Sequence, residues 1–482
     1  MNNFLITHRS LTNMKFHTLA FATLLGISSL VAQDSTPGQE VRVFKGTNGK
    51  EIKAALIDKT DTTATLLLEN KRRAVVPFSS LSEADQEYIK SWNKEKALFL
   101  QKCLGLSVRQ LLELRGYESF PMTLQGNSII VTAKLHGKEA KFIIDTGAGT
   151  SLLHTKTAEK CELKIGPMTE IISGVAGDVP AGWVEVPTLS LGESLFKDRK
   201  ILATDMDKDK PEGARSNDTA GLFGADLLSQ LDTVISYKEN RIFFRPDKSD
   251  RSQVEGDAAK SVDAGIEGEV KNKDEALNFR IFKTRDGKTF RANIVSKTST
   301  VLTVNLVNGK SQQVPIANLS DEDQKYADAW TEAGDFFLRF CGALTIEELL
   351  NLRKYNAFQY ERRGNHIFVD GTLNDAEVTW MIDTGADSSL LDLKQANKSG
   401  CEVGPMDHKV YGIGGSAPAG ETVMKKITLG KVELTNRRTL ATDMSARSGR
   451  DLDYVGLFGA DFMRELDAVI TYSEKKIFLY QR

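Results

Sequence analysis

The chain of 482 residues is longer than one ordinary hydrophobic core needs, and its length predicts three or four domains. Apolar residues make up 40% and charged residues 27% of the sequence, which is typical of a globular protein. The formal net charge of −2 gives no electrostatic reason to bind nucleic acid. We therefore expect no nucleic-acid partner.

The N-terminus predicts export. Lys15 precedes a short apolar run, residues 16–32, after which the sequence turns polar. A basic residue, a short apolar stretch and small residues near a cleavage point around residue 32 are typical of a secretory signal peptide. We expect residues 1–33 to be removed and the protein to be periplasmic or secreted. An uncleaved anchor is the alternative, but the run is short and interrupted, and no later stretch approaches a membrane span.

Residues 40–92 predict a small strand-rich module. Short alternating strands surround a hairpin turn at Asn48-Gly49, and a helix follows Ser82, whose side chain suits an N-cap. This pattern resembles the small SH3-like modules called Sla-homology domains. The resemblance implies a binding or scaffolding role rather than catalysis.

A helical connector and a larger β unit follow the small module. Leucine periodicity predicts a helix over residues 93–118, within a connector that runs to residue 121. Residues 122–246 then read as a unit of strands that ends in a closing hairpin. Residues 247–278 are charged and lack aromatic residues, which indicates a solvated linker.

The second half of the chain repeats the first. Asp145 and Asp383 are 238 residues apart, and the same offset relates Gly174 to Gly412. The period is far longer than that of a solenoid repeat and indicates a tandem duplication. We expect a second small module at residues 279–330, a second helical connector at 331–359 and a second β unit at 360–482.

Each β unit contains an apolar strand that ends at Asp-Thr-Gly, at residues 142–147 and 380–385. Burying one carboxylate at the end of such a strand is costly because the charge loses its hydration. Two such carboxylates brought together can share one proton.

The motifs that follow Asp-Thr-Gly keep the same order in both copies. A glycine-rich hairpin comes first, and then an apolar pair and Gly precede a short helix, near residues 220–228 and 455–463. This order resembles the retropepsin family of retroviral-type aspartic proteases. The resemblance implies a mainly β fold with two acid-protease barrel units, each preceded by a small SH3-like barrel and a helix.

The resemblance also implies an exported aspartic endopeptidase in which Asp145 and Asp383 activate a water molecule to cleave a polypeptide substrate, without metal or organic cofactor. Other residues would support the loops or form the flaps, although the flap glycines equally suit plain hairpin turns. The loop-support residues are Thr146, Gly147, Thr384 and Gly385, and the flap glycines are Gly174, Gly177, Gly412, Gly414 and Gly415.

Two assemblies fit the sequence. One chain holds both halves of a site, which favours an internal pseudo-dimer. A homodimer that pairs Asp145 with Asp145 and Asp383 with Asp383 also fits. The copies differ beside the motif, because Asp387 in the second corresponds to Gly149 in the first. This difference predicts asymmetric hydrogen bonding around the site.

The cysteines and histidines offer no competing chemistry. In an exported protein the four cysteines suggest two disulfides, Cys103–Cys161 and Cys341–Cys401, with four buried free thiols as the alternative. No histidine after the leader recurs at its partner position, so a metal site or triad shared by both copies is unsupported. We expect these histidines to lie at the surface or to be satisfied by hydrogen bonds: His136, His154, His366 and His408.

A second class of function competes with proteolysis. The chain could be a non-catalytic scaffold of the cell envelope that binds peptides or proteins and retains the protease fold. A scaffold has no physical need for two buried carboxylates, so their presence in both copies favours catalysis.

Overall fold

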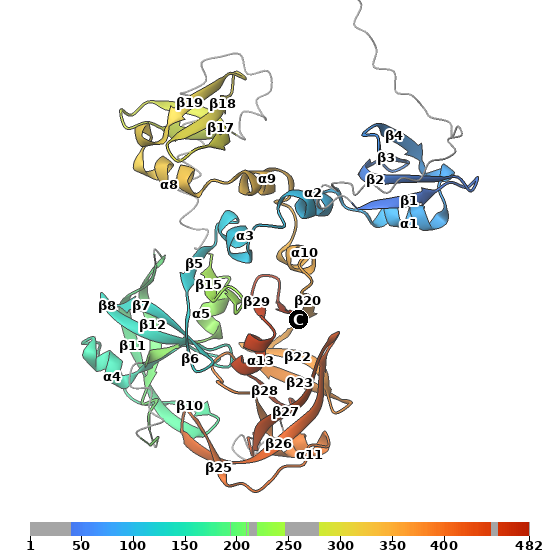
Figure 1. Cartoon of the computed structure of the whole chain (residues 1–482). Coiled ribbons are helices and arrows are strands. Elements are labelled where there is room, and N and C mark those ends of the chain that lie inside the picture. The colour runs from blue at the N-terminus through green and yellow to red at the C-terminus, as the bar shows by residue number, and fades with distance from the viewer. Residues whose placement is uncertain are drawn as a thin grey trace, which may run out of the picture. The chain divides into compact units, whose positions relative to one another are not determined.

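The computed structural model describes residues 40–192, 194–208, 210–211, 219–245, 279–444 and 452–481. The expected signal peptide and the expected linker lie outside these residues. The chain divides into two compact units, residues 1–105 with 335–344 and residues 106–334 with 345–482. Each unit is considered by itself below (Figure 1).

The first unit contains a four-stranded antiparallel sheet in the order β1-β2-β3-β4. Ser82 caps the helix that follows, as expected, because its side chain accepts the N–H of Asp85. Phe44, Leu66 and Ile89 fill the core between sheet and helix. The elements are β1 (Val41–Lys45), β2 (Glu51–Lys59), β3 (Thr63–Leu68), β4 (Arg73–Pro77), η1 (Phe78–Ser80), α1 (Glu83–Ser91) and α2 (Lys94–Lys102).

The helix expected over residues 93–118 is wrong in its extent. Two helices replace it, α2 and α3 (Val108–Leu114), and a strand starts at Glu118. The second helix starts anew because Ser107 and Gln110 form a capping box. The corresponding segment of the second copy divides in the same way, into α9 (Glu332–Phe340) and α10 (Ile346–Asn351).

The second small module repeats the first, again with four antiparallel strands and a helix. Arg280 lies over the ring of Tyr326 and pairs with Asp323, as Arg42 does with Tyr88 and Asp85 in the first module. The SH3-like class of both modules stays a prediction. The elements are β16 (Arg280–Lys283), β17 (Thr289–Lys297), β18 (Val301–Leu306), β19 (Ser311–Pro315), η4 (Ile316–Asn318) and α8 (Asp321–Ala329).

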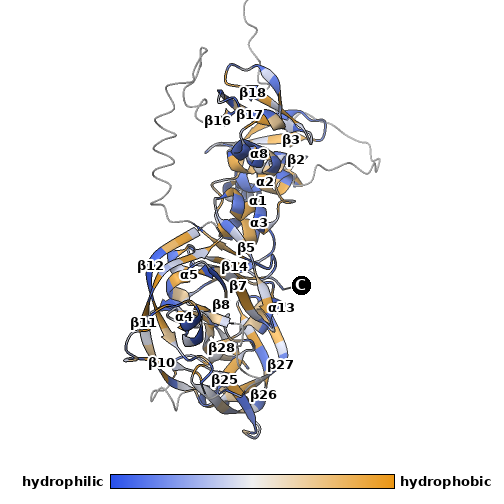
Figure 2. Cartoon of the chain, turned by 90° about the vertical axis from the view of Figure 1, so that its left-hand side faces the viewer, coloured by the Kyte–Doolittle hydropathy of each residue, from blue (hydrophilic) through white to orange (hydrophobic). Residues whose placement is uncertain are grey.

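Two eight-stranded sheets confirm the expected pair of mainly β units. In the first, the strand order is β10-β11-β12-β9-β13-β8-β7-β6, and β7 also pairs with β11. Hydrophobic and hydrophilic residues alternate along much of β11 (Figure 2), so one face of this strand packs inward, whereas the last four residues of β12 are all buried. The elements are β6 (Thr123–Gln125), β7 (Ser128–Leu135), β8 (Lys138–Ile144), β9 (Leu152–His154), α4 (Thr155–Lys160), β10 (Glu170–Gly174), β11 (Gly177–Leu191), β12 (Ser194–Thr204), β13 (Thr219–Phe223) and α5 (Ala225–Gln230).

The second eight-stranded sheet has the equivalent order, β21-β22-β23-β28-β24-β27-β26-β25, and β22 also pairs with β26. One continuous hydrophobic core includes residues from both copies, among them Phe142 and Trp380. The elements are β21 (Glu361–Arg363), β22 (His366–Leu373), β23 (Ala376–Ile382), β24 (Leu390–Asp392), α11 (Leu393–Lys398), β25 (His408–Gly412), β26 (Gly415–Leu429), β27 (Val432–Thr442), β28 (Gly456–Phe458) and α13 (Ala460–Glu465).

A six-stranded sheet contains strands from both copies, in the order β20-β30-β29-β14-β15-β5. The copies meet where β14 pairs with β29, with Ile235 opposite Ile470. Val108 of α3 and Ile346 of α10 belong to a buried cluster on this sheet. The strands are β5 (Glu118–Pro121), β14 (Val234–Ser236), β15 (Arg241–Phe244), β20 (Asn356–Gln359), β29 (Val469–Thr471) and β30 (Lys476–Leu479).

The expected disulfide pairing is wrong. All four cysteines are buried free thiols, and the thiol of Cys103 is hydrogen-bonded to that of Cys341. Cys161 faces the carbonyl oxygen of Leu135 at 3.9 Å, and Cys401 lies 3.3 Å from an amide nitrogen. The sequence expectation joined cysteines within each copy, whereas α2 and α9 bring equivalent cysteines of the two copies together.

Candidate active site

The two Asp-Thr-Gly loops lie against each other. Asp145 follows β8 and Asp383 follows β23, and the two carboxyl groups are hydrogen-bonded to each other. Each carboxylate also accepts two backbone N–H groups of its own loop at 2.9 Å, from Gly147 and Ala148 in the first copy. The Asp-Thr-Gly motif of each copy therefore contributes one carboxyl group to a single site.

Parallel pairing fixes the end of each strand that carries an aspartate. β13 runs parallel to β8, and the N–H of Asp145 donates to the carbonyl of Phe223 at 3.0 Å. The equivalent bond in the second copy, from Asp383 to Phe458, is 3.1 Å long. A side chain at Gly221 would overlap the backbone of Leu152, because β13 passes between β8 and β9. Gly456 is crowded in the same way by Leu390. The glycine that follows the apolar pair, Gly224, is crowded instead by the backbone of Thr150 and Ala148.

The threonines of the two loops hold each other. The hydroxyl of Thr146 donates to the carbonyl of Ile382 at 2.9 Å and accepts the N–H of Thr384 at 3.1 Å. The hydroxyl of Thr384 makes the equivalent bonds to Ile144 and Thr146, at 2.7 and 3.0 Å. Both threonines are fully buried, so these bonds are protected from competition with water.

The glycines after the threonines permit this close approach. A Cβ atom on Gly147 would overlap the carboxyl group of Asp383, and one on Gly385 would overlap that of Asp145. Any side chain at either position would push the carboxyl groups apart.

The glycine-rich hairpins meet across the two copies. Gly174 pairs with Gly177 at the tip of the first hairpin, and Gly412 pairs with Gly415 at the tip of the second. The N–H of Ala176 donates to the carbonyl of Ile413 at 3.3 Å. Gly177, Gly414 and Gly415 have positive φ angles, which favour glycine. These tips correspond to the expected flaps.

An apolar cluster lies beside each aspartate loop, and each includes a residue from the flap of the opposite copy. The first contains Leu152, Met206 and Ala148, with Ile413 from the second copy. The second contains Met381 and Ala386, with Val175 from the first copy, and adds the aromatic rings of Phe368 and Tyr454. The two sides of the dyad therefore differ in size and aromatic character.

The expected asymmetry near Asp387 is present. The carboxylate of Asp387 accepts N–H groups of Asn127 and Ser128, in the hairpin of the first copy. In the equivalent place, the side chain of Asn365 donates to the carbonyl of Gly149 at 2.7 Å. Sequence reasoning missed both asparagines, although a Gly-Asn pair recurs at the same place in both copies, at residues 126–127 and 364–365.

His366 takes the space left by the missing carboxylate of the first copy. Its Nε2 atom lies 3.4 Å from where a Cβ atom of Gly149 would be. Its Nδ1 atom is buried and has no hydrogen-bond partner. The sequence prediction that this histidine lies at the surface or is satisfied by hydrogen bonds is therefore wrong. The sequence did not mark His366 because the other copy has Ser128 at this position and no motif is repeated there.

The two aspartates are electrostatically unequal. Burial raises the pKa of Asp145 well above its ordinary value, and the charge and hydrogen bond of Asp383 raise it further. Burial also raises the pKa of Asp383, but backbone N–H groups, the hydrogen bond from Asp145 and the positive charge of His366 oppose this rise. The pKa is therefore raised more strongly at Asp145 than at Asp383.

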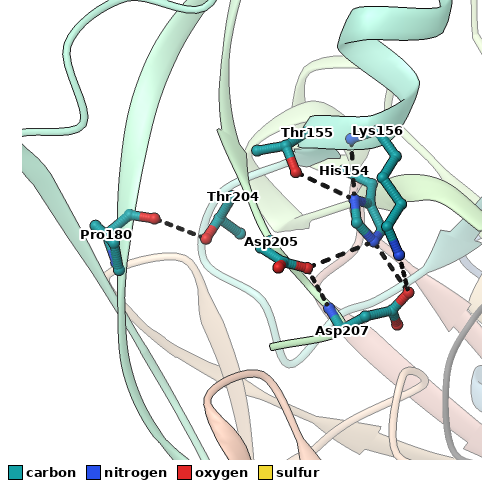
Figure 3. A network of polar contacts seen from close by, with 7 residues as sticks. All are labelled: His154, Thr155, Lys156, Pro180, Thr204, Asp205 and Asp207. Carbon is teal, nitrogen blue, oxygen red and sulfur yellow. Dashed lines mark hydrogen bonds and ion pairs between the residues drawn. The ribbon is translucent and has the colours of Figure 1, made fainter. Parts of the chain in front are cut away.

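His154 is a buried capping residue, as Figure 3 shows. Its Nδ1 atom accepts the N–H of Lys156 at the start of α4, and its Nε2 atom lies 3.1 Å from the carboxylate of Asp207. Asp392 caps α11 at the equivalent place in the second copy. The network therefore anchors a helix start, in keeping with a histidine satisfied by hydrogen bonds.

Neither a metal cluster nor a membrane-spanning helix is found within the described ranges. No three His, Cys, Asp or Glu side chains there gather as ligands for a metal ion. No helix among these residues is long and apolar enough to cross a membrane.

Comparisons with known proteins match the two β units. The family model described as "Aspartyl protease" matches residues 131–227 and again residues 369–462. A retropepsin-like aspartic protease from Rickettsia conorii is 20% identical and covers 26% of this chain and 98% of its own, with a TM-score of 0.21. EIAV protease in complex with the inhibitor HBY-793 is 23% identical and covers 21% of this chain and 86% of its own, with a TM-score of 0.17. No curated protein matches the sequence.

Proposed function

We propose that this chain is an endopeptidase with one active site. The premise is that it belongs to the retropepsin-like aspartyl proteases and carries their domain in tandem. The observation that carries this proposal is the hydrogen-bonded pair of Asp145 and Asp383, one from each copy. Two carboxyl groups that share one proton can act as an acid and a base at the same time.

The unequal pKa shifts support placing the shared proton on Asp145 and the negative charge on Asp383. Asp383, which holds the negative charge, takes a proton from a water molecule that attacks the carbonyl carbon of the peptide bond. Asp145, which holds the shared proton, donates it to the carbonyl oxygen. The resulting tetrahedral intermediate collapses when Asp383 passes the proton that it gained to the leaving amide nitrogen, while Asp145 recovers its proton from a hydroxyl group of the intermediate. No covalent bond to the protein forms at any step.

The flaps and apolar clusters support a polypeptide substrate. An extended peptide that enters between the flaps and the dyad would present side chains to both apolar clusters. The second cluster contains Phe368 and Tyr454, whereas the first contains aliphatic side chains and methionine. We therefore expect different side-chain preferences on the two sides of the cleaved bond.

We also propose that the enzyme works as an internal pseudo-dimer in an exported protein. The six-stranded sheet and the mutual threonine bonds support the pseudo-dimer, because both join copies of the same chain. The N-terminal segment after Lys15 supports export. N-terminal sequencing of protein recovered outside the cytoplasm tests the export proposal, and an intact N-terminus there would contradict cleavage.

The decisive experiment measures cleavage of an unfolded protein between acid and neutral pH. Asp145→Asn and Asp383→Asn, made separately, should each lose at least ~10²- to 10⁴-fold of the activity, the usual cost of removing a general acid or base. Asp198→Asn, at an exposed position outside the site, is the matched control. If the unchanged protein cuts nothing at any pH and binds no statine-type inhibitor, the non-catalytic binding scaffold is the better interpretation.

A further inference from the structure

The helices α2 and α9 bring equivalent positions of the two copies together. Phe99 of α2 and Phe337 of α9 are 238 residues apart, which is the period of the duplication. Their rings meet edge to face, with centroids 6.3 Å apart, and both are fully buried. The two copies thus form a second meeting point, made by helices instead of aspartate loops.

A cysteine stands at the end of each of these helices. Cys103 is the C-cap of α2, and Cys341 directly follows α9. Both side chains are fully buried, and their thiols are hydrogen-bonded to each other. The Sγ atom of Cys341 also lies 3.6 Å from the carbonyl oxygen of Glu95 in α2. The two thiols are therefore hydrogen-bonded neighbours within one compact unit.

We propose that Cys103 and Cys341 form a disulfide that joins the two copies when the protein is oxidised. Each thiol loses one hydrogen and the two sulfur atoms bond. A small disulfide oxidant such as oxidised glutathione takes up the two electrons and two protons and becomes two thiols. The other two cysteines lack such a neighbour, since Cys161 faces a carbonyl oxygen and Cys401 an amide nitrogen.

The surroundings of the pair determine when the bond forms. Burial, with Cys103 close by, raises the pKa of Cys341 to about 12, and burial also raises the pKa of Cys103. A thiol must lose its proton to attack a disulfide, so the folded pair reacts slowly. Oxidation therefore takes place while the chain folds or when the helices separate, and the finished bond is shielded from small reductants.

The position of the bond in the sequence gives it a distinct consequence. Cys103 precedes the expected linker, residues 247–278, and Cys341 follows it. A bond between these cysteines keeps the two copies covalently joined even if the linker is cut. The within-copy pairs expected from sequence, Cys103–Cys161 and Cys341–Cys401, would not hold the halves together.

The test uses the full chain with a recognition site for a specific protease placed within residues 247–278, in the Asp383→Asn background to prevent self-cleavage. The protein is refolded with oxidised and reduced glutathione, cut, and run on denaturing gels with and without reductant. We expect one band without reductant and two bands with it. Cys103→Ser should give two bands in both gels, whereas Cys161→Ser, the matched control, should behave like the unchanged protein.

Peptide mapping of the same samples identifies the bond directly. Trypsin releases Cys103 in residues 103–109 and Cys341 in residues 340–353. We expect these two peptides to be linked in the oxidised protein, with a mass lower by two hydrogen atoms than their sum. Four free thiols after refolding with oxidant, or links to the peptides that carry Cys161 and Cys401, would overturn the proposal.

Discussion

At the scale of single residues, two identical Asp-Thr-Gly loops become unequal through their neighbours. The first loop ends at Gly149 and faces His366, whereas the second ends at Asp387 and faces Ser128. The positive charge of His366 acts on Asp383, whereas Ser128, the counterpart of His366, supplies no such charge to Asp145. This difference adds to the backbone N–H groups and the hydrogen bond from Asp145 that lower the pKa of Asp383.

Replacing His366 with Ser, the residue at the equivalent position, should move the acid limb of the activity profile to higher pH. His366 lowers the pKa of Asp383, so its removal raises that pKa, and Asp383 loses its proton only at higher pH. The rate at the optimum should fall by less than the ~10²-fold expected for loss of a general acid or base. The pH dependence of kcat/KM measures the shift.

Ser128→Ala is the matched control for this change, because Ser128 is the counterpart of His366 and binds Asp387 through its backbone N–H. Its acid limb should coincide with that of the unchanged protein. An acid limb that stays in place in His366→Ser would show that the histidine does not influence the dyad.

The raised pKa of Asp145 also predicts how stability depends on pH. A carboxyl group with a higher pKa in the folded than in the unfolded state stabilises the fold at low pH, and this contribution is lost as pH rises above the unfolded value of about 3.9. Asn at this position keeps the side-chain shape and does not titrate. Asp145→Asn should therefore have the higher Tm at neutral pH, by about 2–4 °C for each kcal/mol of stability.

The Tm of both proteins, measured from acid to neutral pH, checks this prediction. The difference should shrink as pH falls toward the unfolded value. Asp198→Asn, which changes an exposed carboxylate, controls for the change in net charge. Parallel curves for Asp145→Asn and the unchanged protein would contradict a buried carboxyl group with a raised pKa at this position.

At the scale of elements, the two flaps differ in how much space the opposite flap leaves beside their equivalent glycines. A Cβ atom on Gly174 would overlap the carbonyl oxygen of Ile413 in the opposite flap. A Cβ atom on the equivalent Gly412 would meet its nearest atom, the Cβ of Val175, at 3.5 Å, an ordinary contact. The chain thus supplies one flap position without room for a methyl group and one with room.

Gly174→Ala should therefore separate the flap tips and weaken substrate positioning, with kcat/KM reduced by ~10- to 100-fold. Gly412→Ala should leave kcat/KM nearly unchanged. Steady-state kinetics on one peptide substrate compares the two variants directly. Equal losses in both would mean that the flaps respond to reduced backbone freedom and not to contact between their tips.

Sequence patterns predicted some of these elements and missed others for physical reasons. The 238-residue period and alternating strands predicted the mainly β pair of units, which the structure confirms. The six-stranded sheet was missed because β14 and β29 span only three residues each and look like ordinary hairpin strands. His366 and the Cys103–Cys341 contact were missed because contacts between the copies leave no pattern within either copy.

At the scale of the whole molecule, the duplication places two Asp-Thr-Gly loops in one chain, and the structure shows them in contact with each other. The pairing of β14 with β29 is symmetric about Ile235 and Ile470. The threonine bonds lie in the same compact unit and are also symmetric. A β ladder combined with a shared core is harder to exchange between molecules than a loop contact alone, because the three residue pairs of β14 and β29 and the core must separate first.

Mixing two inactive chains tests whether the site belongs to one molecule. If Asp145 and Asp383 of the same chain form the dyad, Asp145→Asn and Asp383→Asn are both inactive, and a refolded equal mixture of them stays inactive. A dyad formed between chains, Asp145 of one with Asp383 of the other, would restore about a quarter of the sites in such a mixture. Homodimers that pair like with like would instead leave each single variant with one working dyad before any mixing. Activity assays before and after mixing, with the mass of the native particle, therefore separate the three arrangements, and the shared sheet predicts that no activity returns.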